Sequence, residues 1–441
     1  MRKIRLETVS RIEGALSLEI KVDSRDNLAG ISWKTDLFRA FETLGVGRPL
    51  EEMPFLTARI CGICAEAHHL ASLQAAEEGL GISPPEGIRK IREAFGLISW
   101  LRDHLTVLLL FSGPDLESFP SPDSLSWLEK TGLWDLFLEN RKHLRRMLEI
   151  VGGRGHLALG GIPGGWGKKI SSEERKELGE RNERVLLLAR KTWELYWEKT
   201  VSQPFLWPVQ SPLVALSPEG SEVLVLPPGK NKPLRFPLSR FYETLVESEE
   251  GSFLKRINLP PFGAYLVGPL ARFYLFPSPD FPLSREAHQA LKNIGEPDLS
   301  RASLFRAYEV LWAAERLKHL LPELPINHSL SFAPLKPVRK QGLGAFEAPR
   351  GLLLHHYTFD LDAVIKTVKI ITPTAQNLGV ISDCVPRFWP YWPLTEEKNL
   401  LFEIQRFIRT FDPCVPCMVH LLRNRSPRDS SPEKEGQRKI F

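Results

Sequence analysis

The spacing of apolar residues predicts strands at the start of the chain and long helices after them. Apolar and polar residues alternate within residues 4–22, as in a strand with one buried face, and a turn-like run at 10–14 interrupts the alternation. In residues 85–112, apolar side chains recur at intervals of three and four, the period of an amphipathic helix. These positions are Ile88, Ile91, Phe95, Ile98 and Leu101.

Other segments extend this prediction. Helical patterns also occur at residues 65–79, 123–152, 171–200 and 299–320. The run Ser171-Ser-Glu-Glu174 is a capping box that marks a helix start. Residues 201–285 are Pro-rich with short strand-like runs such as 222–226, which predicts a β-rich insertion, and residues 370–377 predict a strand that ends in a turn. We therefore expect a predominantly helical α+β fold.

The composition is that of an ordinary soluble globular protein. Of 441 residues, 43% are hydrophobic and 25% are charged, and the net charge is +5. No Arg/Lys stripe with interleaved aromatic residues is present, so we expect no nucleic acid partner. The most apolar run, residues 105–111, is too short to span a bilayer, and no secretory signal precedes the first strand. We expect a cytoplasmic protein, with export alongside a signal-bearing partner left open.

Four of the five cysteines form two pairs, one near each end of the chain. One pair lies in Arg59-Ile-Cys-Gly-Ile-Cys64 and the other in Asp412-Pro-Cys-Val-Pro-Cys417. The four are Cys61, Cys64, Cys414 and Cys417. Two thiol pairs at this spacing predict a single four-thiolate metal site that joins the two ends. The fifth, Cys384, is expected to be a buried free thiol.

The pairs alone leave the metal open. Thiolates bind zinc, iron–sulfur clusters, copper(I), nickel and iron. A structural zinc site usually holds together a domain too small to fold alone, and a chain of this size needs no such site. The helix predicted from residue 65 places Cys64 at a helix N-terminus, where free backbone N–H groups stabilise a thiolate. With His68 and His420 following the two pairs, a reactive site is favoured over a structural one.

At these residues the chain resembles the large subunit of nickel–iron hydrogenases. That family has R-x-C-G-x-C-x-x-x-H near its N-terminus, matched by residues 59–68, and D-P-C-x-x-C-x-x-H near its C-terminus, matched by residues 412–420. Its E-A-P-R-G signature is present at residues 347–351. The resemblance implies a bundle of long helices around the metal site. It also implies reversible oxidation of dihydrogen to protons and electrons.

The resemblance assigns two metals to the four cysteines. Cys61 and Cys414 would bind nickel terminally, and Cys64 and Cys417 would bridge nickel and iron. Iron would also carry carbon monoxide and cyanide. The residues that would shape its pocket are His68, Pro349, Arg350 and Thr374.

Charged residues around the metals receive catalytic roles from the same resemblance. Arg350 would hang over the open side of the metals, where a fixed cation can polarise dihydrogen and act with a carboxylate. Asp103 and Asp412 are the candidate carboxylates. Cys414 would take the proton and pass it to Glu13 of the R-I-E-G run, with Arg350 as the rival base.

The ends of the chain carry two further expectations. Glu42 and His420 resemble the family's magnesium ligands. Residues 1–420 would form the hydrogenase large-subunit domain, and residues 421–441 a polar extension that a maturation protease removes after nickel-insertion factors have acted.

Counting cysteines predicts a partner. With four thiols on the metals, one remains, so the chain cannot hold a four-cysteine iron–sulfur cluster for electron transfer. An iron–sulfur small subunit is therefore expected. The motifs are most similar to those of the cytoplasmic, multisubunit branch, and this resemblance implies diaphorase-type electron-transfer subunits as further partners. The alternatives are a hydrogen-sensing homologue, a structural zinc or interaction protein, and the related quinone oxidoreductase subunit, which lacks the four cysteines.

Overall fold

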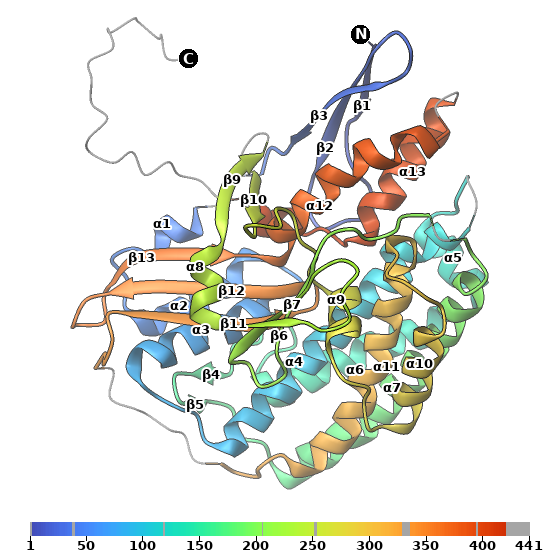
Figure 1. The fold of residues 1–441 in the computed structure, drawn as a ribbon. Coiled ribbons are helices and arrows are strands. Elements are labelled where there is room, and N and C mark those ends of the chain that lie inside the picture. The colour runs from blue at the N-terminus through green and yellow to red at the C-terminus, as the bar shows by residue number, and fades with distance from the viewer. Residues whose placement is uncertain are drawn as a thin grey trace, which may run out of the picture.

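The computed structural model describes residues 2–37, 40–117, 120–204, 206–250, 254–328, 336–393 and 396–419 (Figure 1). The predictions for His420 and for the extension at 421–441 lie outside these residues. The described chain is predominantly helical with several small sheets, so the predicted α+β fold class is confirmed.

The strands form antiparallel sheets in which sequence neighbours pair. Three sheets have three strands: β1 (Arg2–Leu6), β2 (Ser17–Val22) and β3 (Leu28–Lys34); β6 (Leu213–Leu216), β7 (Glu222–Leu226) and β8 (Leu234–Pro237); β11 (Gln341–Ala348), β12 (Gly351–Phe359) and β13 (Ile365–Ile371). Two hairpins pair β4 (Gly161–Ile162) with β5 (Gly165–Trp166), and β9 (Val246–Glu250) with β10 (Leu254–Asn258).

Helices make up most of the remaining described chain. The longer ones are α3 (Ala65–Leu80), α4 (Glu86–Thr106), α6 (Trp134–Gly152), α7 (Ser172–Thr200), α11 (Ala302–Leu320), α12 (Pro373–Phe388) and α13 (Glu397–Thr410). The shorter ones are α1 (Phe41–Gly45), α2 (Met53–Thr57), α5 (Ser124–Lys130), α8 (Leu238–Thr244), α9 (Pro269–Leu275), α10 (Pro282–Lys292) and α14 (Val415–Met418).

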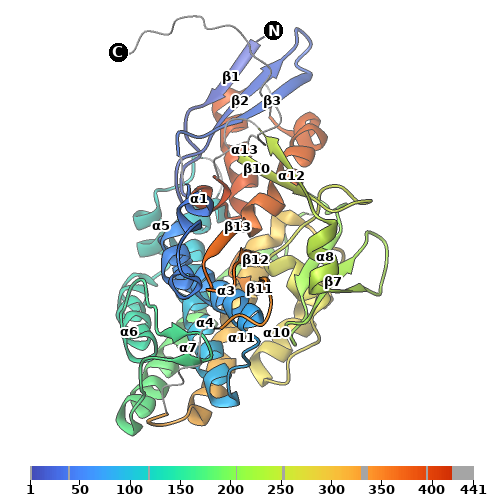
Figure 2. The same cartoon turned by 90° about the vertical axis from the view of Figure 1, so that its left-hand side faces the viewer.

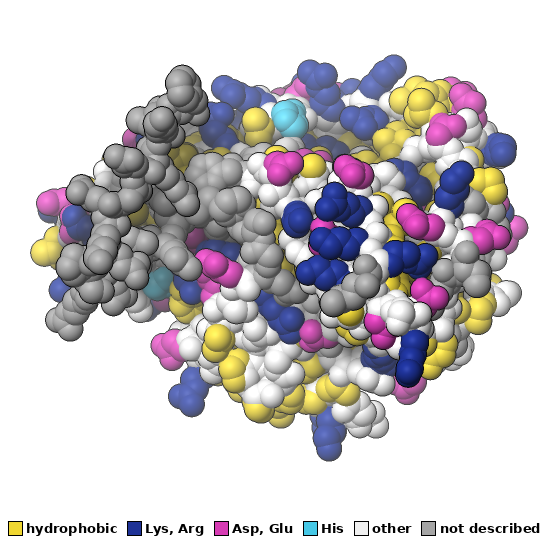
Figure 3. All heavy atoms as spheres, turned by 90° about the horizontal axis from the view of Figure 1, so that it is seen from above, with side chains coloured by type: hydrophobic (Ala, Val, Ile, Leu, Met, Phe, Trp, Pro, Cys, Tyr) yellow, Lys and Arg dark blue, Asp and Glu magenta, His cyan; other side chains and the backbone are white. Residues whose placement is uncertain are grey.

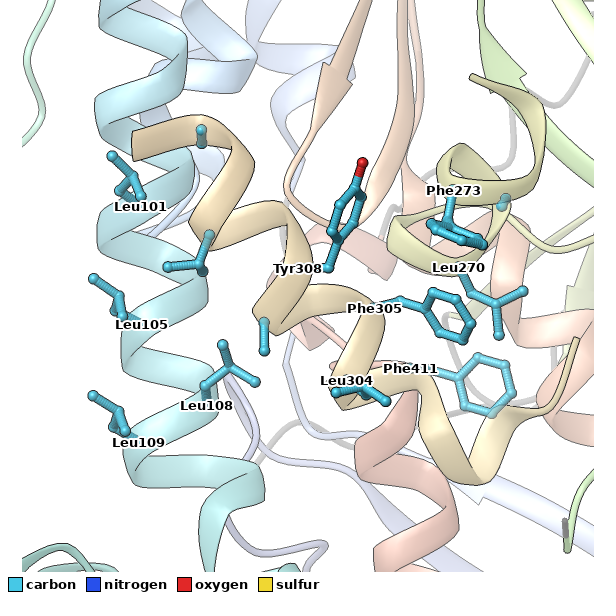
Figure 4. Packing of buried hydrophobic residues seen from close by; sticks show 14 of the residues in the cluster. Leu101, Leu105, Leu108, Leu109, Leu270, Phe273, Leu304, Phe305, Tyr308 and Phe411 are labelled. Atoms are coloured by element: carbon cyan, nitrogen blue, oxygen red, sulfur yellow. The ribbon is translucent and has the colours of Figure 1, made fainter. Parts of the chain in front are cut away.

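Long helices form one side of the molecule and the sheet β11–β12–β13 lies beside them (Figures 1 and 2). Helices α4, α6, α7 and α11 pack along one another and bury a continuous apolar core. In that core Phe305 of α11 points toward Leu270 and Phe273 of α9 (Figure 4), and the rings of Phe273 and Phe305 are 4.9 Å apart. The β-rich insertion is present as β6 to β10, with α8 and α9 between and after its strands.

Two predicted elements differ from the structure. The single helix expected at 123–152 is two helices, α5 and α6, because Gly132 between them adopts a positive φ of 68° and ends the first. The turn expected at 372–377 is instead the start of α12, with Pro373 in its first turn, where the missing N–H of proline costs no hydrogen bond.

One helical run is long and apolar enough to cross a membrane by length and composition alone. It extends from Glu86 to Leu116, with a mean hydropathy of 1.4 in its most apolar window. The apolar run at 105–111, which is too short to span a bilayer by itself, is therefore part of this longer apolar helical run. Since 78% of that window is buried within the molecule, its pattern is that of a core helix.

The exposed face of the N-terminal sheet is basic. Glu19 of β2 lies 3.4–3.6 Å from Lys3, Arg5 and Lys34 of the neighbouring strands. Figure 3 looks down on this end of the molecule and shows Lys and Arg side chains gathered around an acidic one. Charged side chains on a small sheet discourage pairing with strands of other chains.

Helix α3 lies directly on the strand β11 because both surfaces are made of small residues. A Cβ atom added to Gly342 would stand 1.9 Å from the carbonyl oxygen of Ala75, and one added to Gly344 would stand 2.0 Å from that of Ala71. Real Cβ atoms never approach backbone that closely, so only glycine allows the helix to sit here. This contact matters because α3 and the β11–β12 turn both carry predicted site residues.

We predict that Gly344→Ala destabilises the protein by about 1–3 kcal/mol or more, since helix and strand must move apart. Chemical unfolding measures this loss. Gly179→Ala is the matched control, because Gly179 lies inside α7 with no atom within 4 Å of the added Cβ, and there alanine should stabilise by about 1 kcal/mol. Equal stability of the Gly344→Ala variant and the parent would contradict the close-packing argument.

Candidate metal centre

The two ends of the chain meet side by side. Glu13 and Cys414 form an isolated parallel bridge, in which the N–H of Val415 donates to the carbonyl oxygen of Glu13 at 2.9 Å. The next residue, Gly14, has a positive φ of 89°, and a Cβ there would stand 2.7 Å from Pro416 Cδ. Glycine in the R-I-E-G run therefore lets this loop pack against the second cysteine motif.

The four predicted cysteines converge. Their sulfur atoms all lie within 4.8 Å of one another, and all four residues are buried. Cys61 Sγ lies 3.3 Å from Cys414 Sγ, and Cys64 Sγ lies 3.6 Å from Cys417 Sγ. Each of these two contacts joins one thiol from the front of the chain to one from the back, and the two thiols from the back, Cys414 and Cys417, lie 2.9 Å apart. Cys384 is a buried free thiol outside this group, as expected.

The buried thiols resist losing their protons together. The hydrogen bond to Cys414 raises the pKa of Cys64 and of Cys417, and burial raises the pKa of Cys414. Burial also opposes ionisation of Cys61, but hydrogen bonds from the other three thiols outweigh it and lower its pKa. Without a metal, the four cysteines therefore favour a state with one thiolate and three protonated thiols. A bound cation would displace the three remaining protons. Cys64 is the N-cap of α3, which confirms its predicted place at a helix N-terminus.

Arg350 is a buried cation held by two aspartates. Its Nη1 donates to Asp103 Oδ2 at 2.8 Å, its Nη2 donates to Asp412 Oδ1 at 3.1 Å, and its Nε donates to the carbonyl oxygen of Asp412 at 2.7 Å. These carboxylates hold the pKa of Arg350 well above its usual value although burial opposes this. Burial raises the pKa of Asp412 to about 6 against the pull of Arg350. The predicted proximity of Asp103 and Arg350 is thus present.

A rigid hairpin turn aims Arg350. Ala348 pairs with Gly351, so Pro349 and Arg350 form the two-residue loop between β11 and β12. Gly351 has a φ of 127°, and a Cβ there would stand 2.6 Å from Val267 Cγ2. The Arg272 guanidinium donates to the carbonyl oxygens of Ala348 at 2.9 Å and Pro349 at 2.8 Å. The segment at 267–272 thus supports the turn.

A small cavity of about 10 Å³ lies beside two of the four cysteines. Its lining includes Cys64 and Cys417, and neither Cys61 nor Cys414 is among the residues that line it. Its other walls are His68, Arg350, Thr374, Ala67, Ala348, Leu353 and Pro373. Sequence reasoning named the three polar residues but missed the four apolar ones. Pro349 lies between two lining residues.

Other predicted residues lie close to the cysteine motifs. Thr374 Oγ1 accepts from the backbone N–H of Cys414 at 3.2 Å. Glu13 is half-buried, and its Oε1 lies 3.6 Å from where a Cβ of Gly62 would stand, so it contacts both cysteine loops. His68 Nε2 lies 3.6 Å from Cys417 Sγ.

Glu42 has a lysine beside it. Lys255 Nζ donates to the Glu42 carboxylate at 3.2 Å, and the backbone N–H of Ile370 donates to it at 2.8 Å. Lys255 also pairs with Glu247 at 3.0 Å. The carboxylate expected to bind a cation thus has an ammonium group next to it, and the second expected ligand, His420, lies outside the described residues.

Sequence reasoning missed the buried ion group that fixes the two metal-site loops. Asp115 accepts from Arg11 Nη2 at 2.6 Å and from Arg409 Nε and Nη2 at 2.6 and 2.7 Å. Arg11 belongs to the loop of Glu13, and Arg409 precedes Asp412. A lone aspartate after a helix gives no sequence signal, because its partners lie about 100 and 300 residues away.

Known proteins share this sequence pattern and fold. A model of the nickel-dependent hydrogenase family matches residues 39–115 and 299–420. Sulfhydrogenase 2 subunit alpha of Pyrococcus furiosus is 28% identical, over 95% of this chain and 99% of that protein. The chain belongs to the nickel-dependent hydrogenase family. The resemblance to nickel–iron hydrogenases and the predicted enzyme class, a nickel–iron hydrogenase, are confirmed.

Two further comparisons agree with the hydrogenase assignment. NAD-reducing hydrogenase HoxS subunit beta of Cupriavidus necator is 26% identical, over 96% of this chain and 95% of that one. The solved structure of an NAD+-reducing NiFe hydrogenase in the H2-reduced state has a TM-score of 0.85 at 25% identity, over 95% of this chain and 100% of that chain. The relatives are named as subunits, so hydrogenase chains of this kind work in multisubunit enzymes.

We predict that Asp115→Asn destabilises this hydrogenase subunit by about 3–5 kcal/mol, because the buried Arg409 and the half-buried Arg11 lose their shared carboxylate. Thermal or chemical unfolding measures the loss. Asp26→Asn is the control, since the pair of Asp26 with Arg2 is solvent-exposed and such pairs contribute about 0–1 kcal/mol. Similar stability of the two variants would show that the group at Asp115 does not fix the loops.

Proposed function

We propose that this chain is the catalytic subunit of a nickel–iron hydrogenase that reversibly oxidises dihydrogen and passes electrons to an iron–sulfur partner subunit. The observation that carries the proposal is the convergence of four buried sulfur atoms within 4.8 Å from both ends of the chain. Membership of the nickel-dependent hydrogenase family supports it. The related quinone oxidoreductase subunit lacks these cysteines, so that alternative is not favoured.

The residues present fit a two-metal centre. Four thiolates are soft donors that bind nickel and iron as well as zinc. The cavity beside Cys64 and Cys417 adds apolar walls with a few polar groups, which suit small iron ligands such as carbon monoxide and cyanide. Because Cys64 and Cys417 line the cavity and Cys61 and Cys414 do not, we propose that Cys64 and Cys417 would hold iron as well as nickel. Cys61 and Cys414 would hold nickel alone. The bound metals would supply the two-electron chemistry that cleaves dihydrogen.

The charged residues prepare the site for charge separation. Arg350 is fixed by Asp103 and Asp412, so its cation lines the cavity without needing to reorganise. Its hydrogen bonds leave it protonated, which makes it a weaker candidate for the base than a sulfur atom. We therefore place the proton acceptor at Cys414 Sγ and give Arg350, Asp103 and Asp412 an electrostatic role.

Glu13 is the proposed proton exit. Its backbone pairs with Cys414, and its half-buried side chain lies against Gly62, between the metal site and the surface. A carboxyl group in that position can accept a proton from the Cys414 thiol and release it to water. Electrons need another route, since one cysteine remains outside the site, and this supports the iron–sulfur partner.

Three further assignments complete the proposal. We assign magnesium to the Glu42 carboxylate and His420, with Lys255 as its competitor for that carboxylate. We assign removal of residues 421–441 to a maturation protease that acts after nickel-insertion factors, and NAD-linked electron transfer to diaphorase-type subunits. We place the enzyme in the cytoplasm, as proposed from the sequence.

We predict that Cys414→Ala abolishes hydrogen turnover, because it removes both a nickel ligand and the proton acceptor. Hydrogen-dependent reduction of a dye and the nickel content of the purified chain measure the effect. Cys384→Ala is the matched control, since it removes a buried thiol outside the cluster and should retain turnover. Turnover in the Cys414→Ala variant would exclude the assigned role.

We predict that Glu13→Gln blocks proton exchange between dihydrogen and solvent while nickel and iron stay bound. The amide keeps the size of the side chain but cannot carry the proton. Exchange of dihydrogen in deuterated water, followed by mass spectrometry, provides the measurement. The exposed Glu7→Gln should exchange normally, and normal exchange in Glu13→Gln would remove Glu13 from the path.

The deciding experiment is purification with bound partners, followed by metal analysis and infrared spectroscopy. One nickel and one iron per chain, with stretching bands of iron-bound carbon monoxide and cyanide, are expected. One zinc and no such bands would instead support a structural or interaction protein. A hydrogen sensor would show the same bands with little turnover.

A further inference from the structure

We propose that His355 and Tyr357 are positioning residues that fix the ring plane and tautomer of His68 against the sulfur of Cys417. The inference rests on the proposed function for the metal at that sulfur. A continuous hydrogen-bonded chain carries it. Its contacts are His68 Nε2 to Cys417 Sγ at 3.6 Å, His68 Nδ1 to His355 Nε2 at 3.1 Å, His355 Nδ1 to the Tyr357 hydroxyl at 2.6 Å, and that hydroxyl to Ser72 Oγ at 2.8 Å.

The four side chains come together because the residue spacing along α3 matches that along β12. His68 and Ser72 lie four residues apart on α3, which is a rise of about 6 Å along one helix face. His355 and Tyr357 lie two residues apart on β12, about 6.6 Å along one strand face. Because α3 packs on this sheet, the two strand residues lie between the two helix residues in one row. All four side chains are at most 1% exposed.

The hydrogen bonds of this row share one direction. A neutral imidazole has one donor and one acceptor nitrogen, so the direction of one hydrogen bond sets that of the next. In this structure, the Tyr357 hydroxyl donates a hydrogen bond to Ser72 Oγ. It then accepts from His355, which accepts from His68, and the thiol of Cys417 donates to His68.

A metal-bound cysteine is a thiolate and only accepts hydrogen bonds. The row must then run the other way: His68 donates to the sulfur, His355 donates to His68, and Tyr357 donates to His355. Burial raises the pKa of Tyr357, so its hydroxyl stays protonated and remains available as this donor. The row thus holds a donor toward the sulfur when the metal site is filled, as supporting partners of metal ligands do.

Tyr357→Phe tests the proposal by removing one oxygen atom. In the metal-free chain labelled with ¹⁵N-histidine, ring nitrogen shifts report each tautomer. We expect altered signals for His355 and also for His68, which is linked to Tyr357 through His355. Tyr308→Phe is the matched control, because the Tyr308 hydroxyl lies 3.1 Å from His288 Nδ1 in a separate buried pair. It should change His288 alone.

The loaded enzyme gives a second measurement. In Tyr357→Phe, His68 is no longer held as a donor to the Cys417 sulfur, and the weaker hydrogen bond leaves more negative charge on that sulfur. The stretching frequency of iron-bound carbon monoxide should therefore decrease at unchanged nickel and iron content. Tyr308→Phe should leave it in place. If Tyr357→Phe fails to fold, Ser72→Ala at the end of the row should give the same His68 change.

Unchanged His68 signals in a folded Tyr357→Phe or Ser72→Ala chain would overturn the proposal. This outcome is separate from failure of the proposed function. A chain that contains zinc and lacks iron-bound carbon monoxide would refute the hydrogenase function, whereas the histidine measurement needs no metal and still decides the role of Tyr357.

Discussion

The structure depends on keeping the Arg350 guanidinium paired while it is out of water. Moving an unpaired cation into a protein interior costs several kcal/mol, so its partners must be fixed in place. Asp103 comes from α4 and Asp412 from the segment before the last cysteines, and both meet the β11–β12 turn at Arg350. These two ion pairs tie the long helices, the sheet β11–β12–β13 and the segment of the last two cysteines together at the edge of the metal site.

Other buried charges around the site are paired in the same way. Arg272 pairs with Glu309 and Glu347 and also binds two carbonyl oxygens of the Arg350 turn. Asp115 joins the loops of Glu13 and Asp412 through two guanidinium groups. These buried ion groups give rigidity where hydrophobic packing alone would leave the direction of the polar side chains free. They explain how residues on loops can be placed for chemistry.

Sequence patterns located most helices and the cysteine ligands because those signals are local. Apolar periodicity predicted α3, α4, α7 and α11, and the CxxC spacing predicted the thiol group. The helix break at Gly132 and the start of α12 were missed, since each depends on the backbone conformation of one residue. Long-range pairs, such as Asp115 with Arg409 or His68 with His355, were also missed. They join segments far apart, so no spacing in the sequence indicates them.

The pairing of thiols from opposite ends has a consequence for biosynthesis. At a synthesis rate of about 5–20 residues per second, the roughly 350 residues between the pairs take on the order of 20–70 s to emerge. During this time Cys61 and Cys64 have been synthesised but Cys414 and Cys417 have not, while the helices and the β-rich insertion can already fold. The four-thiol site is complete only after Cys417 has been synthesised, so the metals cannot be enclosed before that point.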